Sequence, residues 1–171
     1  MKYHIHYGKL FPVSQDEKKD CLCYIKPPVY SQNKRLCSAD GRQEVSVEII
    51  ETGAGSQHPA HRYIIKDPAG NLLAAGQPGY TGGSDIHPFS RGPRADHVAI
   101  KLPGASCMLQ MQNSQNFILI MEDGKKAMEL IHNGVSGGWN VSADDSLDAL
   151  LVMGIFLFSR YLDKENEFVV V

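Results

Sequence analysis

Five histidine and cysteine residues in the first quarter of the chain have the types of a zinc site: His4, His6, Cys21, Cys23 and Cys37. Imidazole and thiolate are ligands that zinc takes in tetrahedral sets, so four of them could converge if the first strand lay beside the cysteine segment. Against this, zinc sites usually place more residues between paired cysteines, and an H-x-H pair is as often the exposed face of a strand. We assign no metal ligands, and we keep a metal-binding protein or metal-dependent enzyme as the alternative function.

Residues for acid–base or nucleophilic catalysis are present, but no motif places them together. Histidines that could act as a base and residues that could act as a nucleophile are His58, His61, His87, His97, Ser56, Ser84 and Cys107. No G-x-S-x-G or comparable frame sets a nucleophile beside a base. Cys107 lies in a strand-like run, where we expect a small buried core residue. The sequence therefore predicts a non-enzymatic protein without catalytic residues.

The segment from Gly76 to Asp96 is rich in Gly and Pro and has no apolar period. Connections of this length without regular structure are uncommon in compact domains unless they are functional or disordered. Its aromatic and cationic side chains suit an anionic or ring-bearing partner. A solvated loop without a binding role is the competing interpretation. The candidate ligand-binding residues are Tyr80, His87, Arg91 and Arg94.

The elements that must position these residues fit one domain over residues 1–171, because a chain of this length can bury a sizeable core. Seventeen Lys and Arg against nineteen Asp and Glu give a net charge of −2, which argues against nucleic acid as a partner. The first residues contain no continuous apolar run typical of a secretory signal. Four cysteines are too few to indicate a disulfide framework. We expect a cytoplasmic protein with reduced thiols.

Short runs of alternating apolar residues, ended by Gly, Pro, Asn or Asp, predict a mainly β protein. The runs over 62–66 and 72–75 flank a Pro- and Gly-containing segment suited to a hairpin turn. The segment 12–41 has no sustained period, so we expect a loop there with one short strand near 21–25. Further strands are predicted over 3–7, 45–49, 97–102, 107–112, 117–121, 125–132 and 139–141.

A helix is predicted over about residues 142–162, with the Ser142 hydroxyl as its cap and aspartates in its first turn. Residues 149–158 are apolar on every face, which requires enclosure by protein or by lipid. This stretch rises about 15 Å, half of the ~30 Å hydrocarbon core of a bilayer. Asp148 and Arg160 bracket it, so we expect no transmembrane segment. A closed or nearly closed antiparallel β-barrel would enclose every face of the helix.

Three segments carry a family resemblance: the hairpin from Tyr63 to Ala74 with its D-x-x-G-N turn, the run 117–120 followed by Asp123-Gly124, and the helix over 145–162. In this order they resemble the tubby C-terminal-like superfamily, which includes tubby domains, phospholipid scramblases, plant LURP-one-related proteins and small bacterial members. The resemblance implies a twelve-stranded barrel threaded by the helix. It also implies non-enzymatic functions, namely phosphoinositide binding in tubby and lipid-linked roles in scramblases.

The sequence departs from this superfamily at two functional sites. Lys125-Lys126 is a pair, whereas the tubby phosphoinositide site has a concentrated Lys/Arg cluster. Asp144, Asp145 and Asp148 are expected at the start of the helix, so they do not reproduce the calcium-binding stretch of scramblases. We therefore predict a binding or scaffold module, without a cofactor, for a phospholipid headgroup, another small anionic ligand or a protein partner.

Overall fold

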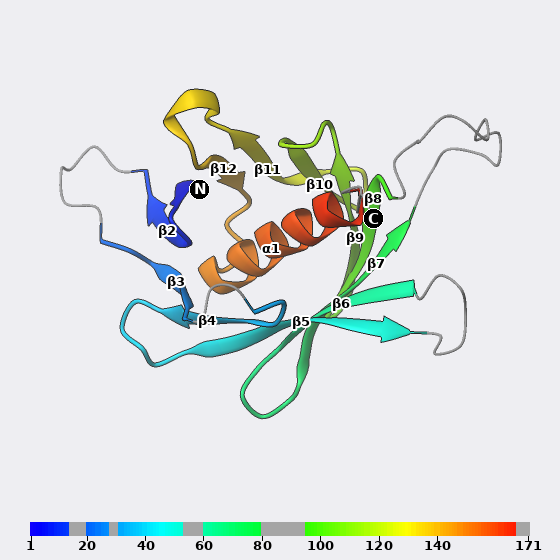
Figure 1. The fold of residues 1–171 in the computed structure, drawn as a ribbon, viewed down its shortest axis with the longest axis horizontal. Helices are drawn as coiled ribbons and strands as arrows, with labels where there is room; N and C mark the ends of the chain where they lie inside the picture. The colour runs from blue at the N-terminus through cyan, green and yellow to red at the C-terminus, as the bar shows by residue number, and fades with distance from the viewer. Residues whose placement is uncertain (14–19, 28–30, 53–59, 80–94, 167–171) are drawn as a thin grey trace, which may run out of the picture.

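The computed structural model describes residues 1–13, 20–27, 31–52, 60–79 and 95–166. Within these residues, twelve strands form a closed antiparallel barrel and one α-helix follows them (Figure 1). The elements are β1 (Lys2–His6), β2 (Lys9–Pro12), β3 (Cys23–Lys26), β4 (Lys34–Ser38), β5 (Glu44–Thr52), β6 (Ala60–Lys66), β7 (Leu72–Gly79), β8 (His97–Leu102), β9 (Ala105–Met111), β10 (Phe117–Met121), β11 (Lys126–His132), η1 (Gly134–Ser136), β12 (Trp139–Ala143) and α1 (Ala149–Glu165).

The strands follow one another around the barrel in chain order, each antiparallel to the next. The barrel closes where β1 pairs with β12, in a register that sets Tyr3 opposite Val141 and Ile5 opposite Trp139. Closure leaves each strand with a hydrogen-bonded neighbour on both sides, which removes the sheet edges that could otherwise pair with other chains.

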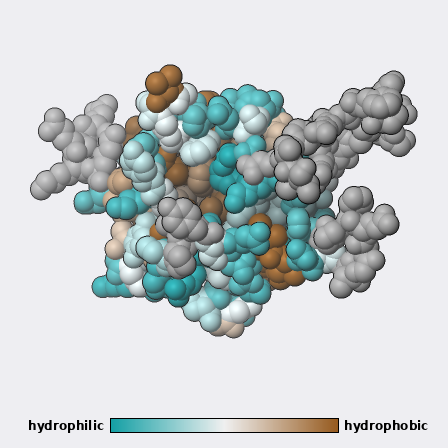
Figure 2. All heavy atoms as spheres, in the orientation of Figure 1, coloured by the Kyte–Doolittle hydropathy of each residue, from teal (hydrophilic) through white to brown (hydrophobic). Residues whose placement is uncertain are grey.

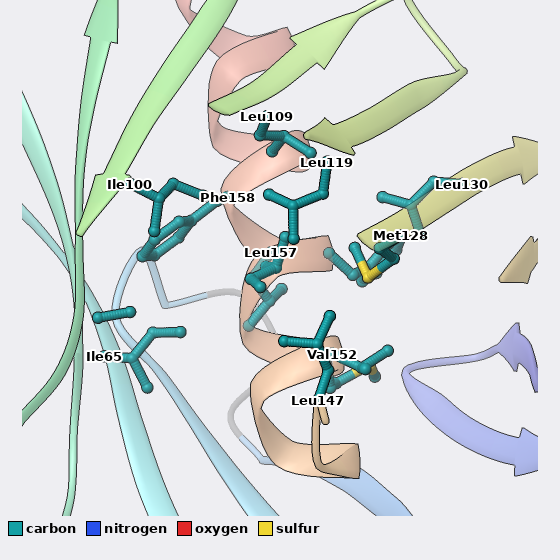
Figure 3. Close-up of a cluster of buried hydrophobic side chains, with 14 of the residues drawn as sticks. Ile65, Ile100, Leu109, Leu119, Met128, Leu130, Leu147, Val152, Leu157 and Phe158 are labelled. Carbon is teal, nitrogen blue, oxygen red and sulfur yellow. The ribbon is translucent and has the colours of Figure 1, made fainter. Parts of the chain in front are cut away.

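Helix α1 lies inside the barrel, as Figure 1 shows. Its residues from Val152 to Ser159 are all buried, on every face of the helix. Figure 3 shows Ile65 and Ile100 packed on one side of α1, with Leu119 and Leu130 on the other. These side chains belong to one continuous hydrophobic core. The prediction of a mainly β protein with a closed barrel around one buried C-terminal helix is therefore confirmed.

The predicted start of the helix at Ser142 was wrong. Ser142 belongs to β12, where it lies between Lys2 of β1 and Glu129 of β11 in the sheet. The helix begins at Ala149, and Asp148 is its N-cap, because its Oδ1 accepts a hydrogen bond of 2.8 Å from the Leu151 amide. Pairing on both sides holds residues 139–143 extended, so Ser142 cannot cap a helix. Asp148, which directly precedes the helix, caps it instead.

Two glycines allow the sheet to approach α1 closely. A Cβ atom placed on Gly154 would lie 2.4 Å from Cδ1 of Ile65 on β6. A Cβ atom on Gly76 of β7 would lie 2.7 Å from Cγ1 of Val98 and 3.1 Å from Cε2 of Phe158. Contacts of 2.4 and 2.7 Å are shorter than real Cβ contacts, so a side chain at either position would force its neighbours to shift.

The outer surface on the face shown in Figure 2 is mainly hydrophilic, with small separate apolar areas. Within the described part of the chain, no helix combines the length and apolar character that crossing a bilayer demands. The apolar residues of α1 instead pack against the strands of the barrel.

Candidate functional site

The four residues predicted to bind a ligand, Tyr80, His87, Arg91 and Arg94, lie outside the described residues. These four residues fall within residues 80–94, and the described residues that flank this range are held near the end of α1. The Ala95 amide donates to Oδ1 of Asn166 over 3.2 Å, and Nδ2 of Asn166 donates to the Ala95 carbonyl over 2.9 Å. The Asp96 amide donates to the Gly79 carbonyl over 2.9 Å, which joins the two ends of the range.

The two histidines of the possible zinc site lie on β1. Their rings stack with centroids 5.7 Å apart, and Nδ1 of His4 lies 3.3 Å from Oδ1 of Asn140 on β12. Both side chains are half-buried, as expected for the outward positions between buried Tyr3 and Ile5.

The cysteines have other partners, on and beside β3 and β4. The Cys23 thiol is buried and donates to the Ala149 carbonyl, and the Cys37 thiol donates to Glu44. Burial raises the pKa of Cys23 to about 12 and also raises that of Cys37, so both remain thiols at neutral pH. Among the described residues no group of three or more His, Cys, Asp or Glu is placed to hold a metal ion. The structure does not bring the five candidates together.

One candidate base, His61, belongs to a polar cluster at the end of α1. Glu165 Oε1 lies 2.6 Å from Nδ1 of His61 and accepts a hydrogen bond of 2.9 Å from the Tyr63 hydroxyl. Burial and the nearby Glu165 carboxylate raise the pKa of Tyr63, so its hydroxyl stays protonated and donates. The candidate nucleophile Cys107 is instead buried in β9, as predicted, and burial raises its pKa to about 11. The cluster fixes the end of α1 to β6.

A hollow of about 660 Å³ lies on the outer surface of β6 to β10. We call it the outer groove and define it by its central residues, Arg62, Ala75, Ala99, Lys101, Met108 and Ile120. Its volume falls within the range of about 300–1,000 Å³ that is typical of small-molecule sites.

The strand register explains the floor of the outer groove. Ala99 of β8 lies opposite Met108 of β9, which lies opposite Ile120 of β10, so these three side chains form a row across the sheet. Ala75 lies opposite Lys101 in the next row. Because Ala75 and Ala99 carry only a methyl group, the surface is lower between the longer side chains around them. Met108 and Ile120 are half-buried and provide an apolar floor.

The charged side chains of the outer groove are unevenly placed. Arg62 and Lys101 are exposed on β6 and β8, and within the described ranges neither forms an ion pair. Glu122 lines the groove beside β10. An anionic group is therefore favoured beside β6 and β8, with an apolar part of the same ligand over Met108 and Ile120.

The outer groove is not among the sites predicted from the sequence. Arg62 and Lys101 are separated by many residues in the chain, and they line the same hollow only because β6 and β8 flank β7. The two alanines at outward positions of β7 and β8 could have indicated a hollow in the surface. This interpretation requires the register between the strands, which the sequence does not show.

Comparisons of the chain with protein-family models, with curated proteins and with solved structures gave no match.

Proposed function

We propose that this protein is a non-enzymatic binding module that holds an anionic ligand with an apolar part in the outer groove. The observation that carries the proposal is the position of Arg62 and Lys101 beside an apolar floor in a hollow of about 660 Å³. A guanidinium and an ammonium group suit phosphate or carboxylate, and Met108 and Ile120 suit hydrocarbon. A phospholipid headgroup with its acyl chains and a free amphipathic anion share this chemistry.

The architecture supports a binding role in a second way. Because α1 and the inward side chains form the core of the barrel, ligand binding falls to the ends and the outer surface. A barrel of twelve strands around a C-terminal helix is also the architecture that the tubby resemblance implies, and lipid-linked functions are those of that superfamily. The cationic site proposed here consists of two residues, so it is smaller than the tubby cluster.

Hexyl phosphate is a suitable probe, because it combines a phosphate with a short alkyl chain. We expect it to shift the amide resonances of β7 to β10 in NMR spectra, and we expect hexanol to bind more weakly. The double variant Arg62→Gln/Lys101→Gln should weaken hexyl phosphate binding about tenfold, since each lost charge-assisted contact contributes about 0.7 kcal/mol at an exposed site. High salt should reduce the difference between the two proteins.

The matched control is Lys9→Gln/Lys164→Gln, which removes two positive charges from exposed positions outside the outer groove. It should bind hexyl phosphate like the unmodified protein. Vesicles of phosphatidylcholine with and without phosphatidylserine then distinguish the sources of the anion: sedimentation only with the anionic vesicles indicates a lipid headgroup, and hexyl phosphate binding without sedimentation indicates a free ligand. Equal loss of binding in both double variants, or no binding of either probe, would refute the proposal.

A further inference from the structure

A second hollow, of about 470 Å³, lies at the end of the barrel where α1 begins. We call it the end pocket. Its apolar lining comes from β5, the β6–β7 hairpin, the β8–β9 turn and the first turn of the helix, and consists of Val45, Ile65, Pro68, Leu73, Pro103, Leu150 and Leu151. None of these residues belongs to the outer groove.

The lining of the end pocket connects its surface to the core. Ile65, Val45 and Leu150 are almost fully buried, whereas Leu151 is half-buried and Pro68 and Pro103 are exposed at the rim. Ile65 is also the residue that packs against Gly154 of α1. An apolar group in the pocket would therefore contact both the central helix and the sheet, and should stabilise the folded state.

Two carboxylates at the rim of the end pocket are paired only with neutral donors. Oδ1 of Asp67 accepts from the Asn71 amide over 2.8 Å, and its Oδ2 accepts from Nδ2 of Asn71 over 2.7 Å. These bonds lower the pKa of Asp67, so it is ionised at neutral pH. Asp148 accepts from the Leu151 amide as the helix cap.

The other charged groups at the rim are already partnered. Glu44 lies 3.0 Å from Lys26 and 3.5 Å from Arg35, which neutralise it. Arg42 also lines the end pocket, but its guanidinium is 86% exposed and lies 3.6 Å from the carboxylate of Asp40, which offsets its charge. The positive end of the α1 dipole offsets part of the charge of Asp148. The uncompensated negative charge is therefore mainly that of Asp67.

We propose that the end pocket binds a small amphipathic amine, with its hydrocarbon part against Ile65, Leu150 and Leu151 and its ammonium group at Asp67. The volume of the pocket is that of a small-molecule site, and an apolar cavity with a few charged groups at the rim is the usual form of such sites. The charge of the rim selects a cation over an anion of the same shape. This inference rests on different residues from the outer groove and stands independently of the proposed function.

Four probes of related shape test the assignment: 2-phenylethylamine, the neutral 2-phenylethanol, the anionic 3-phenylpropionate and ethylamine, which lacks the apolar part. In NMR titrations of the complete chain, 2-phenylethylamine should bind most tightly and shift the amides of Ile65, Asp67 and Leu150. The alcohol should bind more weakly, the anion more weakly still, and ethylamine should give no localised shifts. Binding of the amine should also raise the melting temperature.

Asp67→Asn should weaken 2-phenylethylamine binding about three- to tenfold and leave the affinity for 2-phenylethanol unchanged, because only the charged contact is lost. The matched control is Asp123→Asn. Asp123 has the same kind of turn contact, with Oδ1 accepting from the Lys125 amide over 2.9 Å, but it does not line the end pocket. Equal affinity for the amine and the anion, shifts that map to another surface, or an Asp67→Asn variant that binds the amine like the Asp123→Asn control would each overturn the proposal.

Discussion

Gly154→Ala perturbs the closest approach between α1 and the barrel. The new Cβ would lie 2.4 Å from Cδ1 of Ile65 and 3.3 Å from its Cγ1, and both residues are buried. The same methyl group would improve the intrinsic helix propensity of the position by about 1 kcal/mol. The measured change in the free energy of unfolding is the balance of these two effects.

The structure allows the magnitude to be estimated. Overpacking of a well-packed core costs about 1–3 kcal/mol, so after the gain in propensity Gly154→Ala should destabilise the protein by about 1 kcal/mol. Ile65→Val removes Cδ1, the clashing atom, and by itself should cost about 1 kcal/mol. In the Ile65→Val background the alanine should no longer destabilise, because the nearest remaining atom is 3.3 Å away. The double variant should then be about 1 kcal/mol more stable than additivity predicts.

Urea unfolding followed by circular dichroism gives the four free energies of this cycle, provided that the m-values agree. Ile100→Val provides the control: Ile100 is as buried as Ile65, but none of its atoms is among those nearest to the added Cβ. The effects of Ile100→Val and Gly154→Ala on the free energy of unfolding should add within about 0.5 kcal/mol. Two results would refute the reasoning. One is a coupling energy between Gly154→Ala and Ile65→Val no larger than that between Gly154→Ala and Ile100→Val. The other is a Gly154→Ala variant that is more stable than the unmodified protein by the full ~1 kcal/mol of helix propensity.

Three further predictions concern the core, the surface charges and the thiols. Phe156→Asp should abolish the cooperative thermal melt, because an unpaired carboxylate would be buried inside the barrel; a retained melt would contradict the enclosed helix. Hydrogen bonds from Lys125 and Ser146 hold the pKa of Asp144 below its usual range, so its stabilising contribution is present above the ordinary value near 4 and is lost as the pH falls through the lowered value. Asp144→Asn should therefore lower the melting temperature slightly at neutral pH, by an amount that shrinks in acid; a pH-independent difference would exclude this explanation. Iodoacetamide should modify half-exposed Cys21 of the folded protein before buried Cys23, whose pKa is raised to about 12; mass spectrometry of digested protein reads the order, and equal rates would show that the burial is not maintained in solution.

Much of the secondary structure was predictable because it depends on local periodicity. The strands predicted over 97–102 and 117–121 match β8 and β10, and the turn between β6 and β7 is fixed by Asp67, as the Pro and Gly of that segment indicated. Neither β2 nor β4 was predicted. The first strand was predicted to reach Tyr7, but Tyr7 lies in a turn with a φ of 47° and is 91% exposed. These short strands lack an apolar alternation of their own and depend on their neighbours for pairing.

The sequence alone therefore determined that the all-round apolar helix must be enclosed by sheet, since the rest of the chain is predicted to be β and the helix needs cover on every face. Only the tertiary structure decided where the helix begins, because pairing of β12 with β1 and β11 overrides the capping preference of Ser142. It alone also placed Arg62 and Lys101 around one hollow, and Asp67 in one pocket with the first turn of α1. Such sites arise from strand register and barrel closure, which join residues distant in the chain and leave no local periodic signal.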